Sequence, residues 1–276
     1  MLTLASPAKI NLFLRVLHRR QDGFHDLASL MQTVDLSDTI HFRLGEEDGL
    51  TCTNERLPTD NSNLILKAAD LFRRKTGINQ GLVAYLEKRI PMEAGLGGGS
   101  SNAATTLWAF NSLCGSPATE AELVSWGAEL GSDVAFFLSH GTAYCTGRGE
   151  ILRPISSLPH SYLWIIKPPQ GLSTPKVYGR LDVLKLPQNN PEEALGSFLS
   201  HRPVYFNDLE VPAFEMMPEL ASLKNQLFAS GFSTVLMSGS GSSFFCIGDG
   251  SLPHLPDHLS CSAQFINRKT NSWYCV

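Results

Sequence analysis

The chain has 276 residues, of which 43% are hydrophobic and 17% are charged, and its formal net charge is −4. This length and composition predict a globular protein with one large domain or two smaller ones, and they exclude a disordered or fibrous protein. The small negative charge argues against the broad cationic surface that nucleic acids and anionic membranes attract, so we expect neither as a partner.

The opening residues, MLTLASPAKINLFL, have no basic segment followed by an uninterrupted apolar run. No stretch approaches the roughly 20 apolar residues that a membrane span needs. We therefore expect an untargeted, cytoplasmic protein. The six cysteines form no CxxC pair, which favours reduced thiols over a zinc site or a disulfide framework; they stand at positions 52, 114, 145, 246, 261 and 275.

The first half of the chain alternates between strand and helix patterns. Apolar runs predict strands over about 10–17, 39–44 and 81–90, the last ending at Pro91. Apolar residues at helical spacing predict two helices, one over about 62–76 and one from Ser101 to Leu113.

A third helix is predicted after Pro117. Thr119 is followed three residues later by Glu122, which is the form of a capping box, and Gly131 should end the helix.

The segment TGRGEILRPISSLPHS supplies glycine, proline and serine between apolar runs, which is typical of a domain boundary. We place the boundary so that the domains cover 1–155 and 156–276. Beyond it we predict a strand at SYLWIIK, a helix near 215–230, two strands at STVLM and SSFFCIG joined by a glycine-serine turn, and a short final strand.

The strongest local signal is the glycine-rich run PMEAGLGGGSSNAA at 91–104. Its glycines carry no β-carbon that would keep a backbone amide away from an anion. The two serines and the asparagine are expected to cap the following helix, whose first N–H groups lack internal partners. Strand, glycine loop and helix in this order predict a phosphate-binding site.

Two other glycine motifs do not fit this run. A Walker loop needs Gly-Lys followed by Ser or Thr, and the sequence has no Gly-Lys dipeptide. The dinucleotide motif GxGxxG matches at Gly95 and Gly97, but its third glycine is replaced by Ser100. These mismatches argue against a P-loop NTPase and a Rossmann dinucleotide site.

The run 91–104 resembles the ATP loop of the GHMP kinases, the superfamily of galactokinase and of homoserine, mevalonate and phosphomevalonate kinases. The opening SPAKINLFLRVLHRRQDGFH resembles the branch that phosphorylates a cytidine-diphosphate-linked sugar alcohol for isoprenoid synthesis. The likeness continues, in order and spacing, through DNSNLILKAADLF, GSDVAFFL, TGRGE, NDLE and MSGSGSSFF, and so covers nearly the whole chain.

This resemblance implies an α+β, two-domain GHMP kinase fold. The N-terminal domain would have ribosomal-S5-like topology, the C-terminal domain would be ferredoxin-like, and the active site would lie between them. The matched catalytic positions are Asp133, which would take the proton of the substrate hydroxyl, and Lys9, which would polarise that hydroxyl. Lys9 lies between apolar residues, so its burial would require a partner such as Asp133.

The resemblance also implies the ligand contacts. The substrate positions are Asn11, Phe24, His25, Thr174 and Tyr178, with Phe24 and Tyr178 stacking on cytosine and His25 bonding to its edge. The family more often has tyrosine where this chain has Phe24, and a smaller residue where it has Glu93. The ATP positions are Pro91, Met92, Glu93, Ala94, Gly95, Leu96, Gly97, Gly98, Gly99, Ser100 and Ser101, with Asn63 and Lys88 on the adenosine side.

The SGSGS turn at 238–242 resembles a third superfamily motif and is expected to close over the phosphate loop.

Mg²⁺ is expected with ATP, with Ser100, Ser101 and Asp133 as candidate ligands. His254 and His258 are predicted to lie in a surface loop, because Pro256 breaks the helix that would align them. The chain is expected to be a monomer or weak homodimer.

Two alternatives stay open. Another GHMP kinase, acting on homoserine or a mevalonate derivative, would share the loop and the fold. A non-enzymatic ligand sensor could use the same scaffold. The presence of both Lys9 and Asp133 argues against the sensor.

Overall fold

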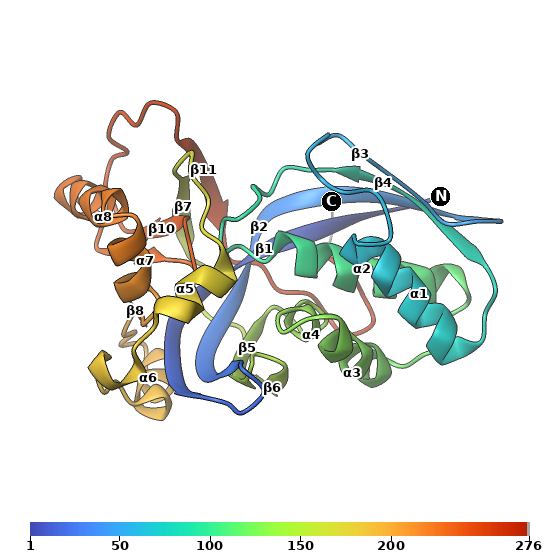
Figure 1. The fold of residues 1–276 in the computed structure, drawn as a ribbon, viewed down its shortest axis with the longest axis horizontal. Helices are drawn as coiled ribbons and strands as arrows, with labels where there is room; N and C mark the ends of the chain where they lie inside the picture. Colours follow the sequence, from blue (N-terminus) through green and yellow to red (C-terminus); the bar gives the residue numbers. More distant parts are fainter. Residues whose placement is uncertain (275–276) are drawn as a thin grey trace.

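The computed structural model describes residues 1–274 and contains two β-sheets with helices packed against them (Figure 1). The predicted mixture of helices and strands is therefore confirmed. The larger sheet and its helices come mainly from the first half of the chain, and the smaller sheet comes from the second half.

Two long antiparallel strands, β1 (Leu2–Arg19) and β2 (His25–Gly45), form the centre of the larger sheet. The predicted strands at 10–17 and 39–44 are only parts of them. The apolar pattern stops short because polar residues such as Lys9 and Ser29 are buried within the ladder. The other strands of this sheet are β3 (Gly49–Cys52), β4 (Gly81–Glu87), β5 (Thr142–Gly147), β6 (Ile151–Pro154) and β8 (Phe206–Asn207).

The smaller sheet has the strand order β11-β7-β10-β9. The predicted strands at SYLWIIK, STVLM and SSFFCIG and the short final strand are all confirmed. They are β7 (Tyr162–Lys167), β9 (Thr234–Met237), β10 (Phe244–Ile247) and β11 (Leu259–Gln264).

The helices of the first half largely follow their predictions. In α1 (Leu64–Thr76), Asn63 caps the start and Gly77 ends the helix with a φ of 73°. In α3 (Glu120–Leu130), the predicted capping box between Thr119 and Glu122 is present. The remaining two are α2 (Gly98–Leu113) and the short α4 (Val134–Phe137).

The helix predicted near 215–230 is confirmed as α8 (Glu219–Ala229), which begins four residues later than expected, with Pro218 at its start. The patterns did not predict α7 (Glu210–Met216), which ends before Pro218. Proline has no backbone N–H and its ring clashes with the preceding turn, so one helix cannot run through it. The patterns did not predict the helical segments α5 (Thr174–Arg180), η1 (Val183–Lys185) and α6 (Pro191–Leu199).

Three apolar clusters show how the layers pack. One lies between the larger sheet and α1 and α2, and includes Phe42, Phe72 and Phe110. A second lies between the two sheets, where Ile10 of β1 meets the strands of the smaller sheet. The third lies between the smaller sheet and α7 and α8. In Figure 1 β1 and β2 run from the part that carries α1 and α2 to the part that carries α5 and α7.

Segments of the second half return to the first. β8 pairs with β1, and the indole N–H of Trp273 donates to the carbonyl of Ala5 at 2.7 Å. Trp273 and Tyr274 belong to the cluster beneath α1 and α2. The domain boundary at residue 155 stays a prediction. Contacts between the two halves of the chain, such as the β1–β8 pairing and the bond from Trp273 to Ala5, cross this boundary.

Within residues 1–274, no helix is long and apolar enough to cross a membrane. The same part of the chain has no group of three or more His, Cys, Asp or Glu side chains placed to hold a metal ion. Five cysteines are free thiols, at positions 52, 114, 145, 246 and 261, and Cys275 lies outside the described residues.

Candidate active site

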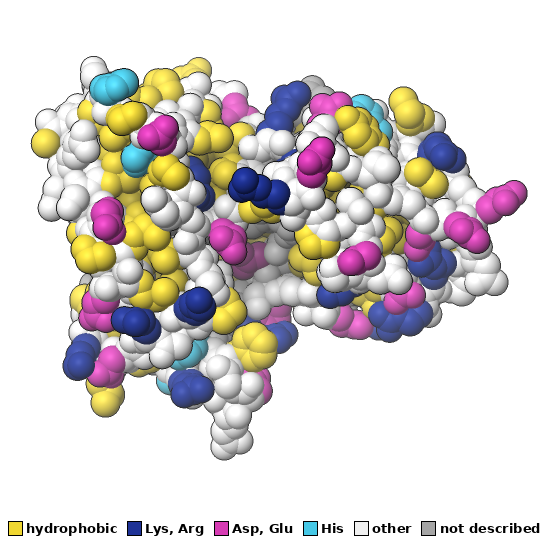
Figure 2. All heavy atoms as spheres, turned by 45° about the horizontal axis from the view of Figure 1, so that its top comes forward, with side chains coloured by type: hydrophobic (Ala, Val, Ile, Leu, Met, Phe, Trp, Pro, Cys, Tyr) yellow, Lys and Arg dark blue, Asp and Glu magenta, His cyan; other side chains and the backbone are white. Residues whose placement is uncertain are grey.

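A cavity of about 980 Å³ collects the predicted functional residues from distant parts of the sequence. Its walls come from β1, the loop before α2, the start of α4 and the helix α5. Figure 2 shows a hollow between the two parts of the molecule. Every site residue that we predicted lines this cavity except Ser101.

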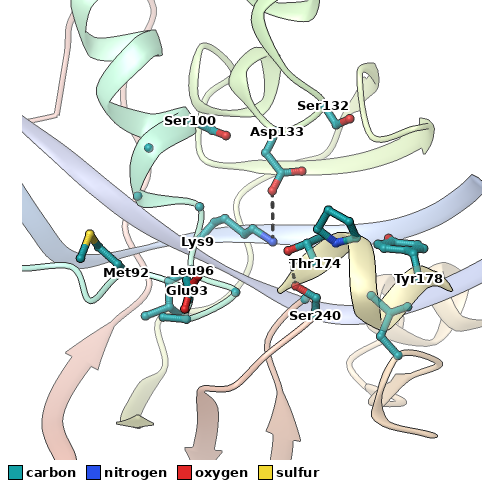
Figure 3. A pocket seen from close by; sticks show the side chains of 18 of the residues that line it. Lys9, Met92, Glu93, Leu96, Ser100, Ser132, Asp133, Thr174, Tyr178 and Ser240 are labelled. Carbon is teal, nitrogen blue, oxygen red and sulfur yellow. Dashed lines mark hydrogen bonds and ion pairs between the residues drawn. The ribbon is translucent and has the colours of Figure 1, made fainter. Parts of the chain in front are cut away.

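Lys9 and Asp133 meet in the cavity, as predicted from their matched positions. Nζ of Lys9 lies 3.4 Å from Oδ2 of Asp133 (Figure 3). The lysine side chain is 4% exposed and the aspartate side chain 28%, so the carboxylate remains accessible from the cavity while the ammonium is enclosed. Asp133 stands at the start of α4 but makes no side-chain cap, which leaves its carboxylate free for other contacts.

The strand β1 aims Lys9 and Asn11 into the cavity. Strand alternation turns their neighbour Ile10 to the opposite side, into the core between the sheets. The register of β1 with β2 shifts on both sides of this pair, between Pro7 and Ala8 and between Asn11 and Phe13. Such irregularities commonly redirect side chains beside functional sites.

Asn11 is buried and joins Lys9 to the sheet. Its Oδ1 accepts from Lys9 Nζ at 2.6 Å, and its Nδ2 donates to the hydroxyl of Ser29 at 2.8 Å. Ser29 donates in turn to the carbonyl of Phe13 at 2.6 Å. Because both ends of the amide are engaged within the protein, Asn11 positions Lys9.

The phosphate loop leads directly into α2, which begins at Gly98, three residues earlier than predicted. Gly97 occupies the cap position with a φ of 70° and without a side-chain cap. The first bond of the helix runs from Ser101 N to Gly97 O, so the N–H groups of residues 98–100 precede it. These N–H groups and the helix dipole can bind an anion.

The prediction that the serines and asparagine cap α2 is wrong. Ser101 is buried and its hydroxyl accepts from Ser6, while Asn102 donates to both Ser6 and Asp38. Both side chains are therefore used to attach the helix to β1 and β2. Ser100 lines the same cavity as Asp133 (Figure 3).

The SGSGS turn packs directly against the phosphate loop. The hydroxyl of Ser238 donates to Gly95 O at 3.0 Å, and Ser243 N donates to Ala94 O at 3.2 Å. A β-carbon on Gly95 would lie 1.9 Å from the carbonyl oxygen of Ser238, so only glycine fits here. On the other side, the hydroxyls of Ser240 and Thr174 lie 2.7 Å apart.

Three of the predicted ATP positions have distinctive surroundings. Asn63 caps α1 and lines the cavity, and Glu93 is exposed and lies against Gly171. Lys88 is buried, and its Nζ donates to Asp38 at 2.6 Å. Burial lowers the pKa of Lys88, although the negative charge of Asp38 acts in the opposite direction.

The predicted cytosine contacts, Phe24, His25 and Tyr178, all line the cavity. The rings of His25 and Tyr178 have centroids 5.2 Å apart. Phe24 is 52% exposed, and the guanidinium of Arg148 lies 5.1 Å from its ring centroid. Burial lowers the pKa of His25, and the charge of Arg19 lowers it further. Burial raises the pKa of Tyr178, as does the negative charge of Asp133.

Sequence reasoning missed several residues of the site. Arg148, Ser132 and Ser240 line the cavity, and Asp38 lies buried behind the phosphate loop. Arg148, Ser132 and Ser240 belong to motifs that carried the family resemblance, so a closer reading of those motifs could have found them. Asp38 lies outside those motifs, and no signal in the sequence singles it out.

Comparisons with known proteins agree with the family resemblance of the sequence. The family model "GHMP kinases N terminal domain" matches residues 63–141. A 4-diphosphocytidyl-2-C-methyl-D-erythritol kinase from Protochlamydia amoebophila is 56% identical over 98% of this chain and 92% of its own. The chloroplastic kinase of the same name from Arabidopsis thaliana is 44% identical over 99% of this chain and 76% of its own.

A solved structure of 4-(cytidine 5'-diphospho)-2C-methyl-D-erythritol kinase is 34% identical, with a TM-score of 0.80. The superposition covers 96% of this chain and 99% of that one. Fold, cavity and likeness together define the class as a small-molecule kinase with the GHMP kinase fold, as predicted. Within that class, the chain belongs to the family of 4-diphosphocytidyl-2-C-methyl-D-erythritol kinases.

Proposed function

We propose that this chain transfers the γ-phosphoryl group of ATP to the 2-hydroxyl of 4-diphosphocytidyl-2-C-methyl-D-erythritol, a step in the non-mevalonate synthesis of isoprenoid precursors. The observation that carries the proposal is the pair of Lys9 and Asp133, which lies in one cavity with the phosphate loop and the rings of His25 and Tyr178. A phosphate donor and a nucleotide-linked alcohol can therefore reach the same pair.

The reaction needs alignment, a proton acceptor and compensation of charge. The substrate O–H bond breaks and its proton passes to the carboxylate of Asp133, while the oxygen forms a new bond to the γ-phosphorus. The bond from that phosphorus to the β,γ-bridging oxygen breaks, and ADP leaves. The ammonium of Lys9, 3.4 Å from Asp133, stabilises the negative charge that develops on the attacking oxygen.

The donors at the site fit a magnesium ion bound together with ATP. Mg²⁺ prefers oxygen ligands and usually keeps several waters, and it offsets charge on the phosphates when bound. Asp133 and Ser100 both line the cavity and carry side-chain oxygens. Ser101 is a poorer candidate, because its hydroxyl accepts from Ser6 in the interior.

The test measures ADP release from Mg-ATP with 4-diphosphocytidyl-2-C-methyl-D-erythritol, with cytidine-free methylerythritol as the control. Release that requires the cytidine compound supports the proposal. Turnover of homoserine or mevalonate without turnover of the cytidine compound would refute it. Asp133→Asn is expected to lower kcat by about 10²–10⁴-fold while ATP still binds, whereas a ligand sensor would keep its biological activity in this variant.

The small-molecule partner in this proposal is the cytidine-diphosphate substrate. A cytoplasmic location and a monomeric or weakly dimeric state stay predictions, which fractionation of the source cells and sedimentation of the purified protein would check.

A further inference from the structure

Asp38 of β2 is fully buried and takes no part in the proposed phosphoryl transfer. Its Oδ1 accepts from the backbone N–H groups of Arg89 and Ile90, each at 2.8 Å. Its Oδ2 accepts from Lys88 Nζ at 2.6 Å and from Asn102 Nδ2 at 2.9 Å. Both carboxylate oxygens are thus engaged by two donors each.

The four donors lie on both sides of the phosphate loop in the sequence. Residues 88–90 come directly before the loop that begins at Pro91, and Asn102 comes directly after Ser101, where the loop has become the first turn of α2. One carboxylate therefore ties together the two ends of the segment whose amides face the cavity.

A second set of contacts fixes this anchor to the sheet. Ser6 of β1 lies opposite Asp38 of β2 in the strand register. The hydroxyl of Ser6 accepts from Asn102 at 2.9 Å and donates to Ser101 at 2.9 Å. The start of α2 is thus held from β1 and β2 at once, and the middle of the loop is tied to β1 as well, where Lys9 N donates to Leu96 O at 3.0 Å.

The charges of Lys88 and Asp38 are consistent with this anchoring of the phosphate loop. The Lys88 and Asp38 side chains are 5% and 0% exposed, and the ammonium is paired with the carboxylate. A buried ammonium that is already paired has little attraction left for a phosphate, whereas removal of its partner would leave an uncompensated charge. Lys88 Nζ lies beside Gly98 of the loop, 3.0 Å from the position of a β-carbon there, and its pairing with Asp38 fixes it in this place.

We propose that Asp38 is a positioning residue of the ATP site, which holds the two ends of the phosphate loop so that its amides point into the cavity before ATP arrives. This inference rests on the proposed ATP-dependent function. A loop that is already in its binding conformation avoids the ordering cost that would otherwise weaken ATP binding.

The first variant is Asp38→Asn, which keeps the shape and the Oδ1 acceptor. It replaces Oδ2 by an NH₂ group that faces the donors of Lys88 and Asn102. We expect the Kd of Mg-ATP to rise about tenfold or more, while the KM of the cytidine compound changes less than about twofold. A merely structural role would lower Tm and the active fraction but leave the Kd of the folded fraction unchanged.

Two further variants keep the proposal falsifiable where Asp38→Asn folds poorly. Asn102→Ala removes only the tie to α2, and a smaller rise in the Kd of Mg-ATP is expected. Asp38→Asn combined with Lys88→Met removes both partners of the ion pair, so the rise in Kd of this double variant should be smaller than the sum of the effects of the two single variants. Glu120→Gln is the control, because Glu120 is held by Arg268 and by Asn271 N away from the cavity.

Direct titration with Mg-ATP separates this inference from the proposed function. An unchanged Kd in both Asp38→Asn and Asn102→Ala would overturn the inference, even where the unmodified chain turns over the cytidine compound. An unmodified chain that binds Mg-ATP but does not phosphorylate the cytidine compound would refute the function, and the anchor could still be measured. An equal rise in Kd for Glu120→Gln would also count against a specific role of Asp38.

Discussion

Asn11 holds Lys9 more closely than Asp133 does: the amide oxygen of Asn11 lies 2.6 Å from Lys9 Nζ, and the Asp133 carboxylate lies 3.4 Å away. The direction of the ammonium is therefore set by a neutral neighbour on the same strand. The Asp133 carboxylate makes the longer contact and is 28% exposed, on the side where the proposed reaction would bring the substrate hydroxyl.

Replacement of Asn11 by alanine is expected to act on the chemical step. Without the amide, Lys9 loses its closest acceptor and moves relative to the reacting oxygen, and small displacements of catalytic groups are costly. We expect kcat to fall by about ten- to a hundredfold, with the KM of each substrate changed less than about threefold. Steady-state kinetics with both substrates varied provides the measurement.

Ser29→Ala is the matched control for Asn11→Ala, because Ser29 bonds to Asn11 and is one hydrogen bond further from Lys9. Its loss of kcat should be smaller. A large rise in the KM of the cytidine compound in Asn11→Ala, with kcat unchanged, would instead assign Asn11 to direct substrate contact.

Gly95→Ala should destroy ATP binding by forcing the phosphate loop away from the SGSGS turn. The new β-carbon would lie 1.9 Å from the carbonyl oxygen of Ser238, and Gly95 has a φ of 73°. Gly77 has the same φ of 73° but open space around its β-carbon position, so Gly77→Ala measures the backbone strain alone.

We expect Gly77→Ala to cost about 1–2 kcal/mol of unfolding free energy and to leave the Kd of Mg-ATP unchanged. Gly95→Ala should cost more and should raise that Kd by at least about tenfold. Equal ATP affinity in the two variants would contradict the close packing of the two loops. Chemical denaturation and ATP titration give both quantities.

The pH dependence of substrate use should report His25. Burial and Arg19 both lower the pKa of His25 from its ordinary value of 6.5, so the ring is mostly neutral at pH 6.5 and takes up a proton only at lower pH. Protonation would place a charge on a half-buried ring and remove its acceptor nitrogen. The kcat/KM for the cytidine compound should therefore stay level through neutral pH and fall at acid pH, below the ordinary pKa of histidine.

The His25→Gln variant should lose this acidic limb, because glutamine does not titrate. Profiles of kcat/KM against pH for the two proteins, with ATP saturating, make the comparison. An acidic limb that persists unchanged in His25→Gln would assign it to another group.

Phe24→Ala tests the predicted stacking on cytosine. Stacking of a base on an aromatic ring is worth about 1–3 kcal/mol, so the KM of the cytidine compound should rise by roughly 5- to 150-fold. The Kd of Mg-ATP should not change, because the role proposed for Phe24 is confined to the cytidine compound. Phe24→Tyr is the conservative control and should retain near-normal KM. A KM unaffected by loss of the ring would remove Phe24 from the binding site.

Sequence patterns predicted the elements that are locally encoded. The capping box at Thr119 and the strands of the smaller sheet were visible because capping residues and apolar runs act over a few positions. The resemblance then supplied Lys9 and Asp133, which lie 124 positions apart and meet only in the folded chain.

The features of the fold and the site that were not predicted depend on long-range contacts, which no local pattern contains. The start of α2 was misplaced because Ser101 and Asn102 bond to Ser6 and Asp38 instead of capping the helix. The lengths of β1 and β2 were underestimated because their buried polar residues are satisfied by partners distant in sequence. The anchor at Asp38 was missed for the same reason, since a buried carboxylate in a strand looks like any surface aspartate until its partners are known.

The pairing of Trp273 with Ala5 bears on how the chain folds during synthesis. The cluster beneath α1 and α2 includes Trp273 and Tyr274, so the N-terminal half lacks part of its core until these residues have left the ribosome. Folding of that half is therefore completed after translation has reached the end of the described chain. The first strand to be made is among the last to acquire all of its contacts.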